Sequence, residues 1–348
     1  MKRVLLIGAG HGHLVVLRSL AEKPLYGARI TLVTPYPKQV YSGMLPGLLA
    51  GHYRRADTQI DVAALAERAD VEFAQGEVER FDAEGRLAIL KDGRSLGYDT
   101  ASLNAGSMID ASSLPGARHH ALAVKPFDHF LSQLRIADRV AVVGAGAAGA
   151  EIAMALRHRG AQVTLYSGAP LQPPALGERT IPQLRKRKVD YRPGMPVTRI
   201  EQGPVVIAGA ARQAFDLVIL ATGAAPLPWL KSSGLATDER GFALVHPTLQ
   251  SLSHPEVFVL GDCATLRDSP HPKSGVYAVR HGELLAANLR RLFSAEPLQP
   301  YVPQKRALLL LTCGARYAIA QRGGWTAQGR TLWWLKDGID RRWVASFR

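Results

Sequence analysis

The sequence predicts an α/β protein made of two Rossmann-like dinucleotide-binding domains, followed by a short C-terminal α+β segment. Two glycine-rich stretches, beginning at Gly8 and Gly144, each stand between a pattern typical of a buried strand and a pattern typical of a helix. A length of 348 residues, of which 47% are hydrophobic, suffices for the cores of two such domains. Duplication of one nucleotide-binding unit is therefore the organising feature of this chain.

The first unit has the order strand, tight turn, helix, strand. Its strands are expected at Val4–Ile7 and Arg29–Thr34, with a helix that runs from the turn to about Glu22. The first glycine of such a turn permits the bend, the second lets a pyrophosphate approach the backbone, and the helix N-terminus offers N–H groups to that anion. A histidine takes the third glycine position, so packing beside the helix is the alternative role for both histidines of the turn. The predicted cofactor-binding residues are Gly8, Gly10, His11, Gly12 and His13.

The second unit is the more complete copy. Arg139–Val143 is expected to be a strand, a helix continues from Glu151 to about Arg159, and the strand Gln162–Ser167 closes the unit. All three glycine positions of the fingerprint are filled, by Gly144, Gly146 and Gly149.

Neither unit carries the acid that normally ends the second strand and holds a ribose 2′-hydroxyl. Thr34 stands at that place in the first unit and Ser167 in the second. We expect Thr34 to hydrogen-bond a ribose all the same. At Ser167 the missing carboxylate removes the repulsion of a 2′-phosphate, so NADH and NADPH both stay open as the second cofactor.

Three later segments complete the layout, at residues 99–107, 217–223 and 257–264. Together with both glycine turns they resemble the pyridine nucleotide-disulfide oxidoreductase superfamily, with its glutathione-reductase-like FAD/NAD(P) fold. The resemblance implies FAD at the first turn and NADH or NADPH at the second, and it places Asp262 on the ribityl or pyrophosphate part of FAD. A helix N-cap is the alternative role for Asp262. The resemblance also adds three strand-end glycines to the cofactor-binding residues: Gly106, Gly223 and Gly261.

The two cysteines, Cys263 and Cys313, form no Cys-x-x-Cys pair, which argues against electron transfer from flavin to a nearby disulfide. We expect both to be small buried residues rather than a sulfur relay. Among the remaining branches, the chain resembles the type II NADH dehydrogenases. Three segments, at residues 41–53, 272–280 and 335–342, are especially similar to the flavoprotein module associated with selenophosphate synthetase, which makes that synthetase a candidate partner.

The resemblance implies an FAD-dependent NAD(P)H oxidoreductase that passes a hydride from nicotinamide to flavin and then reduces a quinone-like or other small acceptor. One departure concerns the quinone, because Val276 and Arg280 stand where type II NADH dehydrogenases carry a glutamine pair. By similarity, Glu151 contacts the nicotinamide end and Pro46 packs against the flavin. Arg280 is a candidate to approach the flavin, and Lys125 is a candidate to reach a phosphate. The alternatives are a helix-dipole role for Glu151, a core role for Pro46 and a surface ion pair for Arg280.

Two other functions stay open. One is oxidation of sulfide or selenide by the flavin, and the other is a non-turnover FAD-binding redox partner in selenium metabolism. The predicted domains are an FAD-binding domain at 1–108 and 244–300, an NAD(P)-binding domain at 109–243, and a C-terminal segment at 301–348. In the last parts of the chain we expect a helix at 274–291, strands at 307–312 and 317–321, and a short helix that holds Arg342, Trp343 and Phe347.

The formal net charge of +14 suits anionic cofactors or an anionic surface, and nothing in the chain resembles a nucleic-acid-binding module. No apolar run approaches the ~20 residues of a membrane-spanning helix, and the N-terminus lacks a signal-peptide pattern. A cytoplasmic protein without a metal site is expected. The Trp-, Lys- and Arg-rich tail is compatible with peripheral contact at the inner face of the plasma membrane, with a homodimer interface or with a cap over the flavin.

Overall fold

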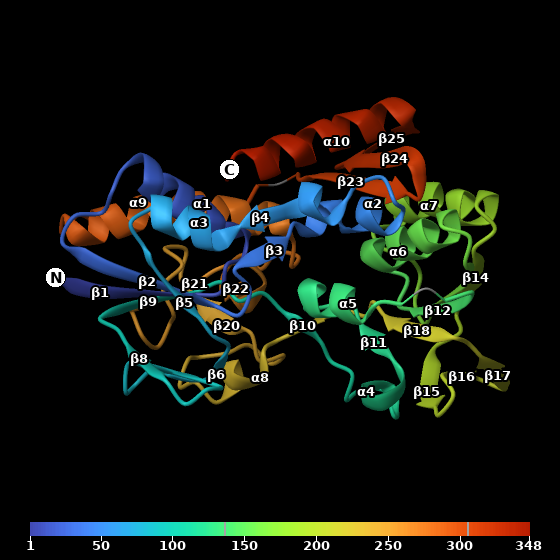
Figure 1. Cartoon of the computed structure of the whole chain (residues 1–348), viewed down its shortest axis with the longest axis horizontal. Coiled ribbons are helices and arrows are strands. Elements are labelled where there is room, and N and C mark those ends of the chain that lie inside the picture. The colour runs from blue at the N-terminus through green and yellow to red at the C-terminus, as the bar shows by residue number, and fades with distance from the viewer. Residues whose placement is uncertain (136, 305) are drawn as a thin grey trace.

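The computed structural model describes residues 1–135, 137–304 and 306–348, and it contains two parallel five-stranded sheets side by side (Figure 1). The first sheet has the strand order β21-β9-β1-β2-β5. Its central strand begins with two exposed residues and continues as Val4, Leu5, Leu6 and Ile7, all buried. Such a continuous apolar run is typical of a parallel strand that is covered on both faces. The strands are β1 (Lys2–Ile7), β2 (Ala28–Thr34), β5 (Glu72–Gln75), β9 (Thr100–Leu103) and β21 (Val257–Val259).

The second sheet repeats this arrangement with the order β11-β18-β12-β13-β14, and every pairing in it is parallel. β12 pairs with β13 as β1 pairs with β2, so the two glycine turns occupy equivalent places. The predicted duplication and the α/β fold class are confirmed. The strands are β11 (Leu122–Ala123), β12 (Arg139–Val143), β13 (Gln162–Ser167), β14 (Asp190–Pro193) and β18 (Leu217–Leu220).

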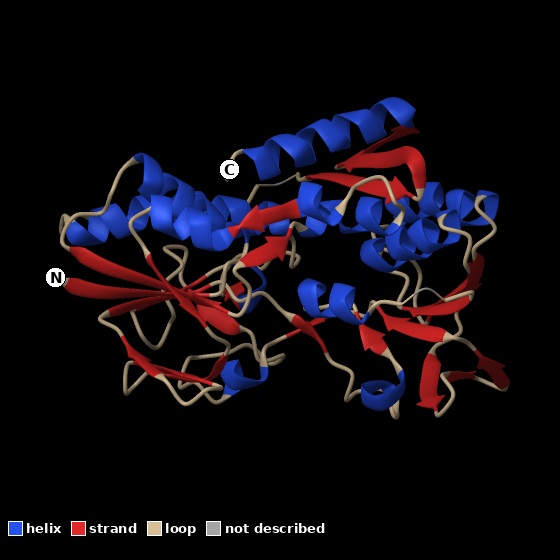
Figure 2. Ribbon diagram, in the orientation of Figure 1, coloured by secondary structure: helices blue, strands red, loops and turns tan. Residues whose placement is uncertain are grey.

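Long helices cover one face of each sheet, and small sheets and short helices lie on the other (Figures 1 and 2). Over the first sheet lie α1 (His11–Glu22), α3 (Val62–Arg68) and α9 (Gly275–Phe293), and over the second α6 (Ala147–His158) and α7 (Pro174–Lys186). The opposite face of the first sheet carries β6 (Val78–Asp82), β7 (Leu87–Leu90), β8 (Ser95–Gly97), α8 (Pro228–Lys231), β20 (Ala243–Val245) and β22 (Ala264–Leu266). The opposite face of the second sheet carries α4 (Ala117–His120), α5 (Phe127–Gln133), β15 (Val197–Glu201), β16 (Val205–Ala208) and β17 (Ala211–Ala214).

The chain passes between the two units through an antiparallel pair of short strands, β10 (Met108–Ile109) and β19 (Ala224–Ala225). We propose that the outward crossing, through β10, marks the boundary between the two domains at residue 109. On the return, Trp229, Leu230 and Ala243 already belong to the core of the first unit. We therefore propose that the second part of the FAD domain begins near residue 226 rather than at 244.

A segment between residues 38 and 61 connects the two units a second time. Met44 packs in the core of the first unit, whereas Leu45 and Leu49 pack in the core of the second. Its elements are β3 (Lys38–Val40), a 3-10 turn (Ser42–Met44), α2 (Leu45–Leu49), a second 3-10 turn (Arg55–Thr58) and β4 (Gln59–Asp61).

The C-terminal segment is a three-stranded antiparallel sheet with one long helix, and it lies across the helical side of both units (Figure 1). The elements are β23 (Leu308–Cys313), β24 (Ala315–Arg322), β25 (Trp325–Gly329) and α10 (Arg330–Ala345). The two predicted strands are present. Arg342 and Trp343 are helical as expected, but they belong to the end of a longer helix, because α10 begins at Arg330 and ends at Ala345, before Phe347. Its buried face includes Lys336, Asp337 and Asp340, so an apolar pattern does not reveal it.

Candidate functional site

A cavity of about 340 Å³ lies at the C-terminal edge of the first sheet, beside the first glycine turn. In parallel α/β sheets ligands bind at this edge, outside the carboxyl ends of the strands. The walls come from the ends of β2, β5 and β9, from the segment 125–128 and from the turn after β21. Among the lining residues are Gly8, Gly10, His11, Thr34, Gly106, Lys125 and Asp262.

The first glycine turn is packed tightly against the end of β9. Gly8 has a φ of +83°, and a Cβ there would lie 2.5 Å from Ala105 Cα. Gly10 donates its backbone N–H to the Asn104 carbonyl oxygen at 3.0 Å and forms the N-cap of α1 without a side-chain cap. Asn104 Oδ1 also accepts the His13 N–H at 3.0 Å, so among the described residues the N–H groups of His11 and Gly12 are the ones left to face an anion in the cavity.

His13 and Gly12 support the turn from behind instead of facing the cavity. His13 is fully buried, and its Nδ1 and Nε2 lie 2.5 Å from the Gly8 carbonyl oxygen and 2.7 Å from Ser102 Oγ. Burial lowers its pKa to about 4. A Cβ on Gly12 would lie 2.3 Å from a methyl carbon of Leu260. The geometry therefore favours a packing role for both residues over the predicted cofactor contact.

His11, by contrast, lines the cavity. Its Nε2 is 3.4 Å from Ser42 Oγ, and its ring meets Tyr41 edge-on at 5.4 Å. Burial lowers the pKa of His11 to about 4, so the ring is neutral near pH 7 and able to accept or donate one hydrogen bond. This placement agrees with the predicted cofactor contact.

Asp262 and Lys125 form a partly buried ion pair in the cavity wall. Lys125 Nζ lies 2.8 Å from Asp262 Oδ2, and Ser107 Oγ donates to the same oxygen at 2.8 Å. Burial favours the neutral acid, but Lys125 and Ser107 outweigh it and lower the pKa of Asp262. Within residues 1–135, 137–304 and 306–348 no side chain bonds Oδ1, so that oxygen can accept a cofactor hydroxyl. Lys125 thus holds Asp262 in place, which sequence reasoning did not foresee.

Two further acids line this cavity, and the sequence analysis named neither. Glu77 follows β5, and Asp128 lies at the start of α5. Both are close enough to Tyr36 to add to the burial that raises its pKa. They come from elements distant in sequence from Thr34, so only the fold brings them together. A polar residue directly after a strand of the sheet was the signal that could have suggested Glu77.

The second glycine turn has a more open geometry. Gly144 has a φ of +107°, and a Cβ on Gly149 would lie 1.8 Å from the Gly144 carbonyl oxygen. A Cβ on Gly146 would meet no atom within 4 Å among the described residues. Gly146 is the N-cap of α6 without a side-chain cap, so this helix start can also face an anion. Ser167 is buried and donates its hydroxyl to the Ala169 carbonyl oxygen, and Gly223 is exposed beyond the end of β18.

Glu151 points from α6 into the C-terminal segment. Its Oε1 accepts hydrogen bonds from Thr312, from the backbone N–H at 2.6 Å and from Oγ1 at 2.9 Å. Burial raises the pKa of Glu151, and the nearby Lys336 ammonium opposes that shift. No acid lies in the first turn of α6, which disfavours the helix-dipole alternative.

Lys336 lies near Glu151 and forms an ion pair with a second buried acid, Asp340. Its Nζ lies 2.6 Å from Asp340 Oδ2 and 2.7 Å from the Gly43 carbonyl oxygen, and both side chains are about nine-tenths buried. Burial raises the pKa of Asp340, while Lys336 acts in the opposite direction. Sequence reasoning missed this group, because its members come from α6, α10 and the segment around Gly43.

Pro46 and Arg280 lie outside the cavity lining. Pro46 is buried in the first turn of α2, which packs against α6, and this position supports its core alternative. Arg280 is exposed on α9 and close enough to Tyr301 to affect the pKa of that phenol. The geometry gives no support for flavin contact by Arg280, and its surface alternative is the better interpretation.

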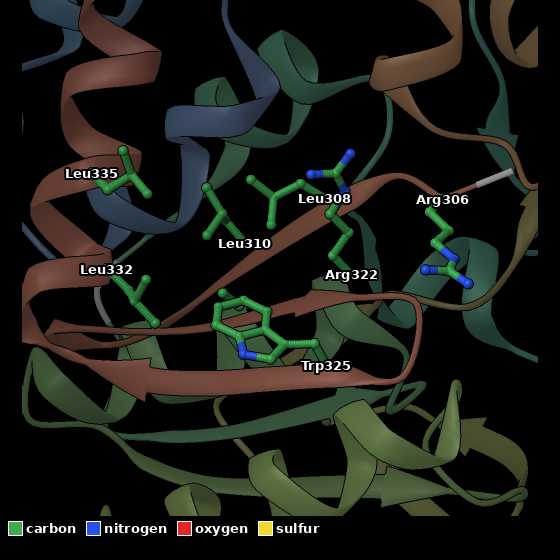
Figure 3. Close-up of a pocket in the computed structure, with 8 residues that line it drawn as sticks. Arg306, Leu308, Leu310, Arg322, Trp325, Leu332 and Leu335 are labelled. Atoms are coloured by element: carbon green, nitrogen blue, oxygen red, sulfur yellow. The ribbon is translucent and has the colours of Figure 1, made fainter. Parts of the chain in front are cut away.

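A second cavity, of about 480 Å³, lies between α10 and the C-terminal sheet (Figure 3). Leucine side chains from β23 and from α10 face one another across it, and Trp325 of β25 closes one side. Two arginine side chains, Arg306 and Arg322, lie at its border. The lining residues are Arg306, Leu308, Leu310, Ala320, Arg322, Trp325, Leu332 and Leu335.

Both cysteines are buried and free. Burial raises the pKa of each thiol to about 12, so neither provides a thiolate near pH 7. Cys263 donates to the Gly106 carbonyl oxygen at 3.0 Å. These positions oppose a thiol relay and agree with the expectation of small buried residues.

None of the helices in the described part of the chain is long and apolar enough to cross a membrane.

Known proteins share this architecture. The chain is 24% identical over 321 residues to an NADH dehydrogenase-like protein, YutJ, of Bacillus subtilis, covering 87% of each chain. It is 22% identical over 382 residues to a type II NADH:quinone oxidoreductase of Staphylococcus epidermidis, covering 98% of this chain and 94% of that protein. Among solved structures, the sulfide:quinone oxidoreductase of Aquifex aeolicus has a TM-score of 0.81 at 17% identity, covering 100% of this chain and 92% of the other.

A family model settles the wider relationship, since it matches residues 2–282, which hold both glycine turns and Asp262. The resemblance inferred from the sequence is confirmed, and with it the prediction of an oxidoreductase that uses FAD and NADH or NADPH. The chain belongs to the pyridine nucleotide-disulphide oxidoreductase family.

Proposed function

We propose that this protein is an FAD-dependent NAD(P)H dehydrogenase that reduces a quinone-like or other small acceptor. The observation that carries the proposal is the pair of equivalent strand-turn-helix units, in which neither α1 nor α6 is capped by its N-cap side chain. Each helix start can therefore hold one pyrophosphate, which matches a protein that binds two dinucleotides. The relatives that carry NADH dehydrogenase names support the same activity.

The side chains of the first cavity fit FAD. The turn at Gly8 and Gly10 would hold the pyrophosphate, and Asp262 Oδ1 would accept a hydroxyl of the ribityl chain while Lys125 holds the other oxygen. The bound flavin supplies the redox chemistry, accepting a hydride from nicotinamide and passing electrons to the acceptor. The residues of this chain bind and orient the two nucleotides, so no nucleophile is required.

Glu151 acts at the second unit. Its raised pKa and its position beside Lys336 and Asp340 let this buried group hold or release a proton while the acceptor is reduced. Thr312 fixes the carboxyl with two hydrogen bonds.

The cavity under α10 supports the identity of the acceptor. An apolar lining with Arg306 and Arg322 at its border suits a ring system that carries carbonyl oxygens. Its volume of about 480 Å³ falls within the usual range for small-molecule sites. We propose that a quinone-like acceptor enters here.

The outer face of α10 supports peripheral attachment to the inner face of the plasma membrane. Trp334 and Ile339 are 54% and 45% exposed, and Arg342 lies beside them on the exposed side. Aromatic and aliphatic groups next to cations bind anionic lipid surfaces. A homodimer would use the same face. A link to selenium metabolism through selenophosphate synthetase is supported by the similarity of segments 41–53, 272–280 and 335–342.

A steady-state assay with purified holoprotein tests the proposed function. NADH or NADPH should be oxidised when a short-chain quinone is added, and Leu310→Trp, which fills the cavity, should raise the KM for the quinone while leaving ferricyanide reduction unchanged. Tight FAD with no turnover for any acceptor would instead identify a redox partner without catalysis. An unchanged KM for the quinone in Leu310→Trp would remove the cavity from the acceptor site.

A further inference from the structure

We propose that Asp128 binds the adenosine ribose of FAD, taking over the role that an acid at the end of β2 would otherwise have. The inference rests on the proposed binding of FAD at the first unit. It concerns a residue that follows the crossing into the second unit, well outside the glycine fingerprint.

The usual place for the ribose acid is occupied by an uncharged residue. Thr34 ends β2, is only 3% exposed and carries no carboxylate. A ribose diol donates its strongest hydrogen bonds to a charged acceptor. The cavity therefore needs a carboxylate from another element if the adenosine end is to be held in the usual way.

Three carboxylates line the cavity, and two of them are occupied or exposed. Asp262 is bound to Lys125 at the opposite end. Glu77 is 53% exposed and pairs with Lys91 at 2.7 Å. The Asp128 side chain is only 11% exposed, which makes it the buried acid at the Thr34 end of the cavity.

Tyr36 fixes the end of the cavity at which Asp128 lies. This tyrosine follows Thr34 by two residues, lines the cavity, and experiences the charges of both Asp128 and Glu77. Glu77 in turn follows Gly76, whose N–H donates to the Thr34 carbonyl oxygen at 3.1 Å. The Val40 N–H also reaches Asp128 Oδ2 at 3.4 Å, so Asp128 lines the part of the cavity formed by the segment that follows β2, and the adenosine of a dinucleotide lies near the end of that strand in a Rossmann unit.

The contacts of Asp128 leave acceptor capacity unused. The Val40 N–H reaches Oδ2 at 3.4 Å, and the Arg55 guanidinium lies 3.8 Å from Oδ1. Both contacts are long, and burial raises the pKa of this carboxyl. An ionised carboxylate accepts about four hydrogen bonds, so two ribose hydroxyls would satisfy it and favour its charged form.

The position of Asp128 has a consequence for the coupling of the two units. α5 follows β11, a strand of the second sheet, whereas Val40 and Thr34 belong to the first unit. A ribose held by Asp128 would therefore connect α5 to the first unit. Bound FAD would then restrict motion between the units as well as supply the flavin.

The test compares FAD with FMN, which lacks the adenosine. Flavin-depleted full-length protein is titrated with each flavin, for the native chain, Asp128→Asn and Glu77→Gln. Asparagine keeps an oxygen for the Val40 N–H but removes the charge. We expect Asp128→Asn to raise the Kd for FAD about 10-fold or more and to leave the Kd for FMN within about 2-fold. A larger rise of the FAD Kd in Glu77→Gln than in Asp128→Asn would assign the ribose to Glu77 and overturn the inference.

Equal weakening of FAD and FMN in Asp128→Asn would overturn the inference, because it would indicate a structural role. Unchanged FAD binding in that variant would overturn it as well. If depletion unfolds the chain, the ratio of FAD to protein in each purified holoprotein gives the same comparison. Native protein that shows no preference for FAD over FMN would contradict the proposed function itself, which separates the two failures.

Discussion

The two glycine turns of this protein occupy equivalent places, but their middle glycines are required by different partners. A Cβ on Gly10 would lie 2.5 Å from the Asn104 carbonyl oxygen, so the protein itself excludes a side chain there. A Cβ on Gly146 would meet nothing within 4 Å among the described residues, and its φ of −67° suits any residue. The first glycine is therefore needed for folding, whereas the second is needed only if a ligand approaches the backbone.

The same contrast extends to the acids of the two units. Asp262 lies in the wall of a cavity and has one oxygen available for a ligand. Glu151 is held by Thr312 of the C-terminal segment. The first unit has a preformed cofactor site, whereas the second is assembled together with the tail.

Alanine at the two middle glycines should give the largest difference. We expect Gly10→Ala to lose bound FAD and to unfold at lower temperature, since the new methyl group must displace the end of β9. Gly146→Ala should keep its FAD and its melting temperature, while its KM for NAD(P)H rises about 10-fold or more because the methyl group occupies the approach of the pyrophosphate. Flavin content, thermal melts and NAD(P)H kinetics measure these effects. A destabilised Gly146→Ala would contradict the contrast.

Asp262→Asn tests the acid of the first unit. The substitution leaves Lys125 without its ion-pair partner and removes the charged acceptor for a ribityl hydroxyl. We expect the Kd for FAD to rise by about 10-fold to 100-fold, as for loss of a hydrogen bond to a charged group. Ser107→Ala, which removes one donor to the same carboxylate, is the matched control and should have a smaller effect. Native FAD affinity in Asp262→Asn would leave the residue a structural role only.

Glu151→Gln tests the acid of the second unit with a smaller expected effect. Glutamine keeps an oxygen for Thr312 but loses the ability to take up a proton. We expect FAD content to stay native, and turnover with a quinone to fall about 10-fold while its pH dependence flattens. Rapid mixing with NAD(P)H in the absence of oxygen shows which half of the reaction is affected. Native rates in both halves would remove Glu151 from the site.

As the pH falls, the first unit should lose stability before the second. His13 and His281 back the first unit, and burial lowers their pKa values to about 4 and about 3, below the ordinary 6.5. Unfolding lets these rings take up protons, so the stability of this unit is complete above about pH 6.5 and falls as pH decreases towards 4. The raised pKa values of Glu151 and Asp340 act in the opposite direction.

Hydrogen exchange between about pH 7 and 5 provides the measurement for this expectation. Amides of β1 and α1 should lose protection earlier than those of β12 and α6. His281 Nδ1 accepts the Gly261 N–H at 3.2 Å, and His281→Gln should reduce the difference between the two units. Uniform loss of protection across both units would show that these histidines do not determine the response.

Local patterns predicted most of the fold. Strands β12 and β13 have the predicted bounds, and α1 ends at Glu22 as expected. A strand, turn and helix are contiguous in the chain, so their residue pattern is visible in the sequence. The helix α10 was misjudged because charged residues occupy its buried face, where they satisfy one another through Lys336 and Asp340.

The site was less predictable, because its side chains meet only after folding. Asn104 accepts the His13 N–H at 3.0 Å and donates to the Leu260 carbonyl oxygen at 3.0 Å, which connects three segments of the chain. Asp128 and the Thr312–Glu151 contact likewise join distant elements. The glycines at the turns were identified because their role is local, whereas Arg280 was assigned by similarity and lies on the surface.

We expect electrons to enter at the second unit and to reach the flavin held by the first. Anaerobic mixing of the holoprotein with NADH, with NADPH and separately with sulfide or selenide tests it most directly. We predict that at least one nicotinamide nucleotide bleaches the flavin absorbance at physiological concentration and that Gly146→Ala slows this step while retaining FAD. Flavin that is bleached only by sulfide or selenide, at the same rate in both proteins, would contradict the account.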